Sequence, residues 1–185
     1  MGKRRLMSAV GVFAAAAAAM LGLAGAANAS TATSPTSGHA AVVPAAGIVV
    51  SIVQDRTLEC IDMPNSGTNA GLRAQEWTCN GTGAQKFTTV NLGNGFFVLV
   101  NQNSGLCLEG VGNFAAAPVA QESRNSGIPG QQWQLTPVVG DPAHLWLANG
   151  LPGLCAQLDP DSAARGSKID LGFCADDNRM FWHFS

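Results

Sequence analysis

Four of the five cysteines are spaced so that they could form two similar disulfides. Cys60 and Cys79 lie 19 residues apart, and Cys155 and Cys174 lie the same distance apart. The equal spacing predicts two local disulfide bonds. Each bond would add about 3 kcal/mol of stability, because it restricts the unfolded chain. Such bonds are typical of exported proteins.

The fifth cysteine, Cys107, stands at the first position of such a pair without a partner. Arg124 and Asn125 occupy the place where a second cysteine would be expected. We therefore predict a free thiol at Cys107. This thiol is either buried and inert or available for pairing with a second chain.

Other residues with catalytic chemistry lack the context that catalysis needs. Two pairs of neighbouring carboxylates have the composition of a glycosidase site: Asp159 with Asp161, and Asp176 with Asp177. Both pairs lie in turn-like segments, where solvated acids are common. The histidines have no metal ligand or nucleophile at a useful spacing: His39, His144 and His183. We therefore predict that the protein is not an enzyme and has no catalytic residue, metal site or cofactor.

Two landmarks recur along the chain with a nearly constant period. Cysteines stand 47 and 48 residues apart, at Cys60, Cys107 and Cys155. A large aromatic residue follows each cysteine after 26 or 27 residues, at Phe87, Trp133 and Trp182. Gln or Met precedes each aromatic by two positions. Because both landmarks keep the period, the chain is predicted to contain one supersecondary unit built three times.

The segments around these landmarks predict short β-strands. Each unit opens with an apolar or alternating run, at 49–53, 96–100 and 145–148. The cysteine follows on a second strand, and a third strand lies at 72–78, 119–122 or 169–173. Gly, Pro and Asn separate the runs, and no helical period is present. We expect an all-β domain of pseudo-threefold symmetry that gathers Phe87, Trp133 and Trp182 in one core, with Trp146 also buried.

Several short motifs resemble the ricin-type (ricin B-chain-like) lectin β-trefoil. They are Cys60-Ile61-Asp62, Gln75-Glu76-Trp77-Thr78-Cys79, Ser104-Gly105-Leu106-Cys107-Leu108 and Gln131-Gln132-Trp133. The resemblance covers residues 48–185. It implies an all-β β-trefoil with repeats at about 48–92, 93–140 and 141–185, each able to carry one shallow sugar site.

The resemblance also implies which residues form a sugar site in the first repeat. A sugar needs a carboxylate and amides for its hydroxyls and a flat aromatic ring for its C–H face. Carried onto this sequence, those roles fall to Asp62, Gln75, Trp77 and Gln85. Ala84 stands where the family usually offers an Asn, so one hydrogen bond is expected to be missing.

Each of these residues also has a structural interpretation. Asp62 precedes Met-Pro-Asn and could cap a turn. Trp77 could be a core residue, although Phe87 already supplies the core aromatic of this repeat. Gln85 could be purely structural, because Gln131 recurs at its position in a repeat without a site.

The second and third repeats lack the same set of residues. In the second repeat, Glu109 replaces the acid and Glu122 replaces the aromatic platform. In the third repeat, Gln157 and Gly172 stand at those positions. Phe173 is adjacent but is expected on the opposite face of its strand. We interpret both repeats as structural.

The beginning of the chain has the pattern of an export signal. Residues 1–29 combine a charged start, a long apolar run and the small-x-small sequence Ala27-Asn28-Ala29. A membrane anchor is the alternative, but the run is Ala-rich and no stop-transfer charges follow it. Residues 30–47 are rich in Ser, Thr, Ala and Pro and predict a flexible leader. The globular domain is expected at 48–185.

Charge argues against two classes of partner. Removal of the signal takes away three of the ten basic residues, which leaves seven against twelve acidic ones, a net charge of −5. No basic cluster is present, so we expect no nucleic-acid partner and no binding to anionic phospholipid. No stretch after the signal is apolar enough to span a bilayer, so we also expect no membrane insertion. The favoured function is a secreted, non-catalytic lectin that binds a glycan or polysaccharide. A degenerate β-trefoil that serves as a protein-interaction or toxin-accessory module is the alternative, and self-association is left open.

Overall fold

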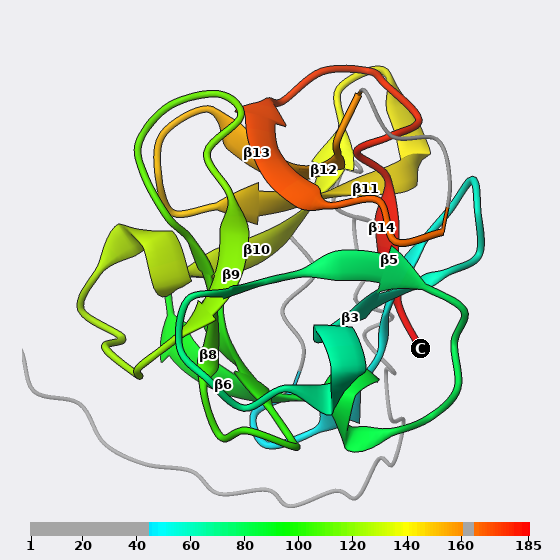
Figure 1. Ribbon diagram of the computed structural model, residues 1–185. Coiled ribbons are helices and arrows are strands. Elements are labelled where there is room, and N and C mark those ends of the chain that lie inside the picture. Colours follow the sequence, from blue (N-terminus) through cyan, green and yellow to red (C-terminus); the bar gives the residue numbers. More distant parts are fainter. Residues whose placement is uncertain (1–44, 161–164) are drawn as a thin grey trace, which may run out of the picture. The chain divides into compact units, whose positions relative to one another are not determined.

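The computed structural model describes residues 45–160 and 165–185, which fold into antiparallel β-structure (Figure 1). The predicted signal at 1–29 and most of the predicted leader lie outside the described residues, as does Asp161. The strands are β1 (Val49–Val50), β2 (Ile52–Gln54), β3 (Cys60–Asp62), β4 (Leu72–Arg73), β5 (Gln75–Trp77), β6 (Phe87–Gly93), β7 (Phe96–Asn101), β8 (Cys107–Gly110), β9 (Val119–Glu122), β10 (Trp133–Val138), β11 (Asp141–Asn149), β12 (Leu154–Leu158), β13 (Ile169–Phe173) and β14 (Trp182–Phe184). Three short 3-10 helices, η1 (Pro64–Ser66), η2 (Gly83–Gln85) and η3 (Pro129–Gln131), lie between them. No helix among the described residues is long and apolar enough to span a bilayer.

Two kinds of antiparallel strand pair each occur three times. The first kind joins the strand that begins at the landmark cysteine, or one residue before it, to a later strand of the same repeat: β3 with β5, β8 with β9, and β12 with β13. Figure 1 shows these three pairs as lobes around a common centre. The second kind joins the strand that begins at the landmark aromatic to its neighbour: β6 with β7, β10 with β11, and β14 with β2. The structure thus confirms a β-trefoil of three repeats.

The core lies where the three repeats meet. Phe87, Trp133 and Trp182 are fully buried in one cluster with aliphatic side chains from every repeat. The Trp133 and Trp182 indoles each donate to a backbone carbonyl, Leu108 O and Ala156 O, both at 2.9 Å. These bonds satisfy the only polar atom of each buried indole. The predicted shared core is therefore confirmed.

One amide side chain in each repeat organises the turn that leads to the cysteine strand. Asn101 and Asn149 accept from backbone amides two residues ahead, and Gln54 does the same. Each also donates across the structure to a backbone carbonyl near the Gln-x-aromatic segment. This repeated set of hydrogen bonds ties the second kind of strand pair to the lobes.

Both predicted disulfides, Cys60–Cys79 and Cys155–Cys174, are present in the structure. Cys107 is free and buried. Burial is the main cause that raises the pKa of its thiol, so the reactive thiolate is disfavoured. Of the two alternatives for Cys107, the structure supports the buried and inert thiol.

Three features differ from the sequence-based expectation. Strands β6 and β10 continue from the Gln-x-aromatic segments, which were expected only to close each unit. Trp146 is half-buried against a small second cluster that contains Met180 and Phe181, rather than within the main core. The end of the predicted leader pairs with the domain, because Thr89 Oγ1 donates to Ala45 O at 2.7 Å.

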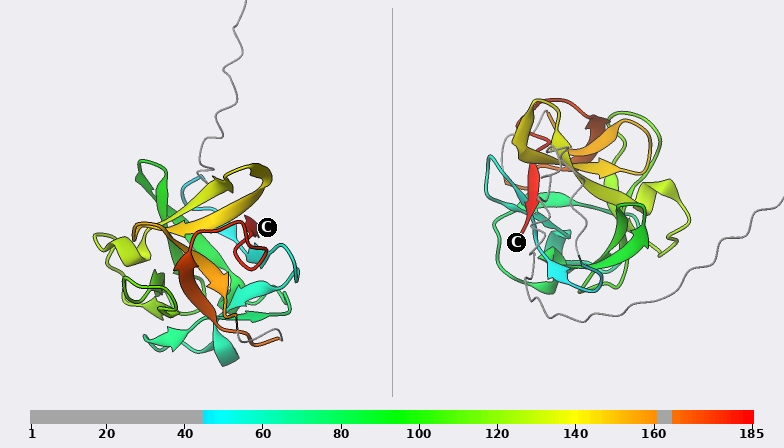
Figure 2. Two further views of the ribbon diagram at one scale, coloured as in Figure 1. Left: turned by 90° about the horizontal axis from the view of Figure 1, so that it is seen from above. Right: turned by 180° about the vertical axis from the view of Figure 1, so that it is seen from behind.

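Seen from above relative to Figure 1, the β10–β11 hairpin (yellow) and the teal part of the first repeat lie at opposite ends of the described domain (Figure 2, left). The teal segment includes η1 and the loops that follow β3 and β5. These loops surround the candidate site.

Candidate carbohydrate site in the first repeat

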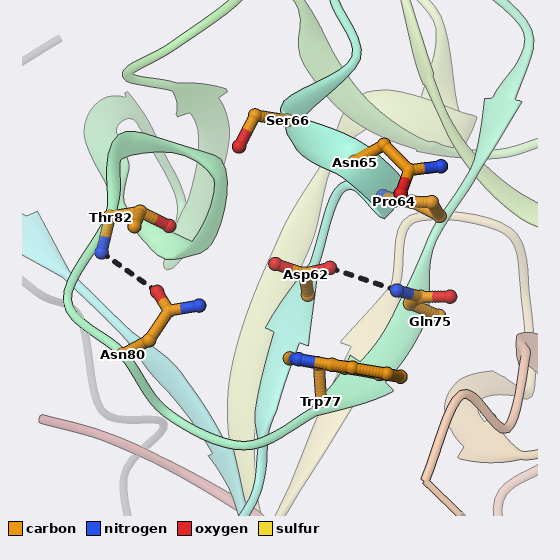
Figure 3. Close-up of a pocket in the computed structure, with 8 residues that line it drawn as sticks. All are labelled: Asp62, Pro64, Asn65, Ser66, Gln75, Trp77, Asn80 and Thr82. Atoms are coloured by element: carbon orange, nitrogen blue, oxygen red, sulfur yellow. Dashed lines mark hydrogen bonds between the residues drawn. The ribbon is translucent and has the colours of Figure 1, made fainter.

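A shallow pocket of about 320 Å³ opens on the first repeat (Figure 3). Its size is at the lower end of the range for small-molecule sites. The lining residues come from β3, β5, η1 and the loop after β5: Asp62, Pro64, Asn65, Ser66, Gln75, Trp77, Asn80 and Thr82. Three of the four predicted site residues, Asp62, Gln75 and Trp77, therefore meet at one pocket.

Strand pairing brings these three side chains to the same face. Asp62 lies opposite Gln75, and Cys60 lies opposite Trp77, in the antiparallel pair of β3 and β5. Side chains two residues apart on a strand point to the same side, so Gln75 and Trp77 flank the acid together. The Cys60–Cys79 disulfide closes the end of this pair beside Trp77.

Asp62 is only 6% exposed, yet it faces the pocket. Its Oδ2 accepts a hydrogen bond of 3.0 Å from Gln75 Nε2, and its other oxygen points away from Gln75 (Figure 3). Among the described residues, no backbone amide of the following turn donates to it, so the structure does not support the turn-capping alternative. Burial raises the pKa of the Asp62 carboxyl, while the Gln75 and Gln85 amides and the Lys168 charge act in the opposite direction.

Trp77 has the environment of a platform rather than of a core residue. Its side chain is 39% exposed, and one ring face lies beneath Asp62 and Gln75 in Figure 3. The other three tryptophans each donate their indole N–H to a backbone carbonyl. Within residues 45–160 and 165–185, the Trp77 Nε1 has no such partner. Both the ring face and the N–H are therefore available to a ligand.

Gln85 is not among the residues that line the pocket, so its contact with a sugar stays a prediction. Its side chain is fully buried, where Oε1 accepts from Asn80 N at 2.7 Å and Nε2 donates to Thr78 O at 2.9 Å. Gln131 makes the same pair of backbone contacts in the second repeat. Gln85 therefore closes the 78–85 loop and positions the pocket wall.

Asn80 and Thr82 on this loop are pocket residues that the sequence interpretation missed. Asn80 Oδ1 accepts from Thr82 N at 3.0 Å, which fixes the amide with its nitrogen toward the pocket (Figure 3). Ala84, the expected position of a missing amide, is a buried residue of η2 itself. An amide is thus supplied from Asn80 instead. The turn sequence Asn80-Gly81-Thr82-Gly83 could have indicated this loop as a wall of the pocket.

The opposite wall holds two residues in a left-handed backbone conformation. Asn65 and Ser66 have φ values of 54° and 52°, a region that Asn tolerates but that is unfavourable for Ser66. Their side chains reach the pocket edge (Figure 3). Backbone strain at a polar pocket is a common property of binding sites.

The second repeat lacks an equivalent site. Ala120 lies opposite Glu109, where Gln75 lies opposite Asp62, and Glu122 lies opposite Cys107 in the place of Trp77. The Glu109 carboxylate accepts from buried Gln131 at 2.8 Å. Two carboxylates without an aromatic face do not suit a neutral sugar.

The third repeat is filled by its own side chains. Gln157 lies over Gly172 so closely that a Cβ there would stand 2.2 Å from Gln157 Oε1. Asp170 replaces Gln75 and is buried in an ion pair with Arg73 of the first repeat. Phe173 is 70% exposed, but its strand neighbour Gly172, and not Phe173, occupies the platform position.

The fold and site together define a lectin-type β-trefoil with a pocket on its first repeat. Residues 41–122 and 85–172 match the ricin-type β-trefoil lectin domain-like family. The two overlapping matches span most of the chain, so the protein belongs to this family.

Individual known proteins support the fold. The designed threefold-symmetric protein ThreeFoil matches with a TM-score of 0.67 and 24% identity, over 74% of this chain and 96% of its own. The ricin B-like lectin of Macrolepiota procera, solved in complex with lactose, matches with a TM-score of 0.64 and 14% identity, over 78% of this chain and 99% of its own. Serine protease 1 of Rarobacter faecitabidus is 44% identical over 46 residues, which are 25% of this chain and only 9% of that protease.

Proposed function

We propose that this protein is a secreted carbohydrate-binding module that binds a glycan, without chemical conversion, at the first-repeat pocket. The observation that carries the proposal is the meeting of a carboxylate, Asp62, and an exposed indole, Trp77, on one face of the β3–β5 pair. Membership of a lectin-like family supports the same function.

The pocket has a donor or acceptor for each part of a sugar. The Asp62 carboxylate accepts from hydroxyl groups, the Asn80 amide donates to ring or hydroxyl oxygens, and the Trp77 ring covers a C–H face. The pocket is open and shallow, so a single monosaccharide should bind with a Kd of about 1 mM, or about 4 kcal/mol. Longer glycans or several copies of the protein on one polymer would raise the apparent affinity.

A glycan array tests this function directly. The array should include lactose, N-acetylgalactosamine and plant and microbial polysaccharides, and the wild type is compared with Asp62→Ala and Trp77→Ala. Each substitution should weaken binding on the order of tenfold, because each removes one of the two principal contacts.

The other two repeats provide matched control substitutions. Glu109→Ala removes the corresponding acid of the second repeat, and Phe173→Ala removes an exposed aromatic of the third. Both should bind as the wild type does. Equal binding by all five proteins would contradict the site, and absence of binding to any glycan by the wild type would contradict the function.

We also propose that the chain is exported and that residues 1–29 are removed. The two disulfides support this, since they persist in oxidising compartments. Mass spectrometry of protein from the culture medium should give a chain that begins at Ser30. A cell-associated chain that retains Met1 would contradict the proposal.

A further inference from the structure

The three repeats contact one another in a cyclic order close to the pocket. Arg73, Pro118 and Lys168 occupy equivalent positions, each two residues before the strand position of Gln75, Ala120 or Asp170. Each pairs with that position in the next repeat: Arg73 with Ala120, Pro118 with Asp170, and Lys168 with Gln75. The first-repeat pocket therefore has the third repeat as its neighbour, and the orange segment before β13 runs beside β5 in Figure 1.

The segment 165–168 is bound firmly along β5. Gly166 N donates to Glu76 O, and Glu76 N donates to Ser167 O, both at 2.8 Å. Arg165 reaches over the Trp77 ring, with its Cζ 5.7 Å from the ring centroid, and its Nε lies 3.3 Å from Glu59 Oε1. Strand β5 and its Trp77 side chain are thus both in contact with the third repeat.

Lys168 of the third repeat contacts the Gln75 amide, which lines the pocket. Its Nζ donates to Gln75 Oε1 at 3.4 Å, and Gln75 Nε2 in turn donates to Asp62 at 3.0 Å. An ammonium group can only donate hydrogen bonds, and an ionised carboxylate can only accept them. The Gln75 amide therefore has one orientation that satisfies both neighbours.

The other repeats cannot make this arrangement. Pro118 has no side-chain donor for the third repeat. The Arg73 guanidinium turns away from Ala120 to pair with Asp170 and Asp159. The lysine-to-amide-to-acid chain is thus found, among the described residues, only where the pocket is developed.

We propose that Lys168 is a positioning residue that orders the Gln75 amide and, through it, holds the Asp62 carboxylate in the correct orientation for the ligand. The inference rests on the proposed function only for the role of Asp62 in binding. The other groups that border Asp62 are the neutral side chains of Gln75 and Gln85 and the residues of η1. Among the described residues, Lys168 is therefore the charged group that acts on the Asp62 carboxylate.

The test compares Lys168→Met, Lys168→Arg and the matched control Lys86→Met in the full chain. The Asp62 carboxyl is titrated by carbon-13 NMR without ligand, and the affinity for lactose is measured at pH 7. Lys168→Met should move the Asp62 titration to higher pH and weaken lactose binding by about fivefold, since the contact is half-exposed. Lys168→Arg should restore both properties, and Lys86→Met should change neither.

The outcomes separate this inference from the proposed function. An unchanged Asp62 titration in Lys168→Met would overturn the positioning role, even if affinity fell. A shifted titration together with weaker binding, rescued by Lys168→Arg, supports it. If the wild type does not bind lactose but the titration still shifts, the role of Lys168 is supported and the choice of lactose is wrong.

Discussion

Asp62 combines two demands that usually conflict, because it is almost buried and must still accept bonds from a ligand. Burial raises the pKa of its carboxyl, so the acid takes up a proton at a higher pH than an exposed aspartate. The ionised form therefore costs some folding stability, which is regained as the pH falls through this pKa. Glu76 and Asp170 have pKa values raised by burial in the same way.

The raised pKa of Asp62 predicts that mild acid has different effects on glycan affinity and on folding stability. As the pH falls through the raised pKa of Asp62, glycan affinity should decrease, because a protonated carboxyl is a poorer acceptor. Folding stability should not fall in the same window. Asp177 contributes the opposite sign, since its bond to Arg179 lowers its pKa, but that stability is lost only below the usual aspartate range.

Calorimetric titration of the glycan together with urea unfolding across pH 3.5–7 would measure both quantities. Asp62→Asn is the control and should bind weakly at every pH. If the wild type and Asp62→Asn lose affinity in parallel on acidification, another group is responsible.

At the scale of elements, the equivalent strand pairs β3–β5 and β12–β13 have different roles. The β3–β5 pair and the β12–β13 pair each hold a disulfide of equal sequence separation. Only β3–β5 supports the pocket. The comparison of the two bonds therefore distinguishes general stability from support of the site.

Removal of either disulfide should lower the free energy of unfolding by about 3 kcal/mol. The double variant Cys60→Ala with Cys79→Ala should also weaken glycan binding, because Trp77 lies next to the bond and loses its restraint. Cys155→Ala with Cys174→Ala should leave affinity unchanged. Urea unfolding and glycan titration of the two variants provide the measurements, and equal effects on affinity would refute a local role.

The cysteine strands could be predicted from the sequence because their landmarks recur, whereas β6 and β10 could not. In β6 the buried positions include polar Thr89, so the strand lacks a clear apolar alternation. β10 alternates only over Trp133–Thr136, and Pro137 then interrupts the pattern at an irregularity. Among site residues, Asp62, Gln75 and Trp77 followed from the motif. Lys168 did not, because its contact spans 93 residues and joins two repeats.

At the scale of the whole molecule, the described domain depends on one core. Phe87, Trp133 and Trp182 come from three repeats and pack in a single cluster. Trp182 also lies on β14, which pairs with β2. The loss of one of these rings should therefore destabilise all three repeats.

Trp182→Leu should lower the free energy of unfolding by about 3 kcal/mol, because it leaves a cavity and frees the Ala156 carbonyl. Unfolding should remain a single transition when it is followed by far-UV circular dichroism and by fluorescence. Val139→Ala, on an 83% exposed residue of the β10–β11 turn, is the control and should be neutral. Two separate transitions in Trp182→Leu would show that the repeats fold independently.

The pairing of β14 with β2 has a consequence for the order in which the protein folds. Phe184 lies opposite Ile52, and Ser51 and Ser185 exchange backbone hydrogen bonds in both directions. Ile52 is thus among the earliest described residues to leave the ribosome and among the last to find its neighbour. Until β14 pairs with β2, this pair of strands stays open, so the described domain is completed only after the Trp182–Phe184 segment has been synthesised.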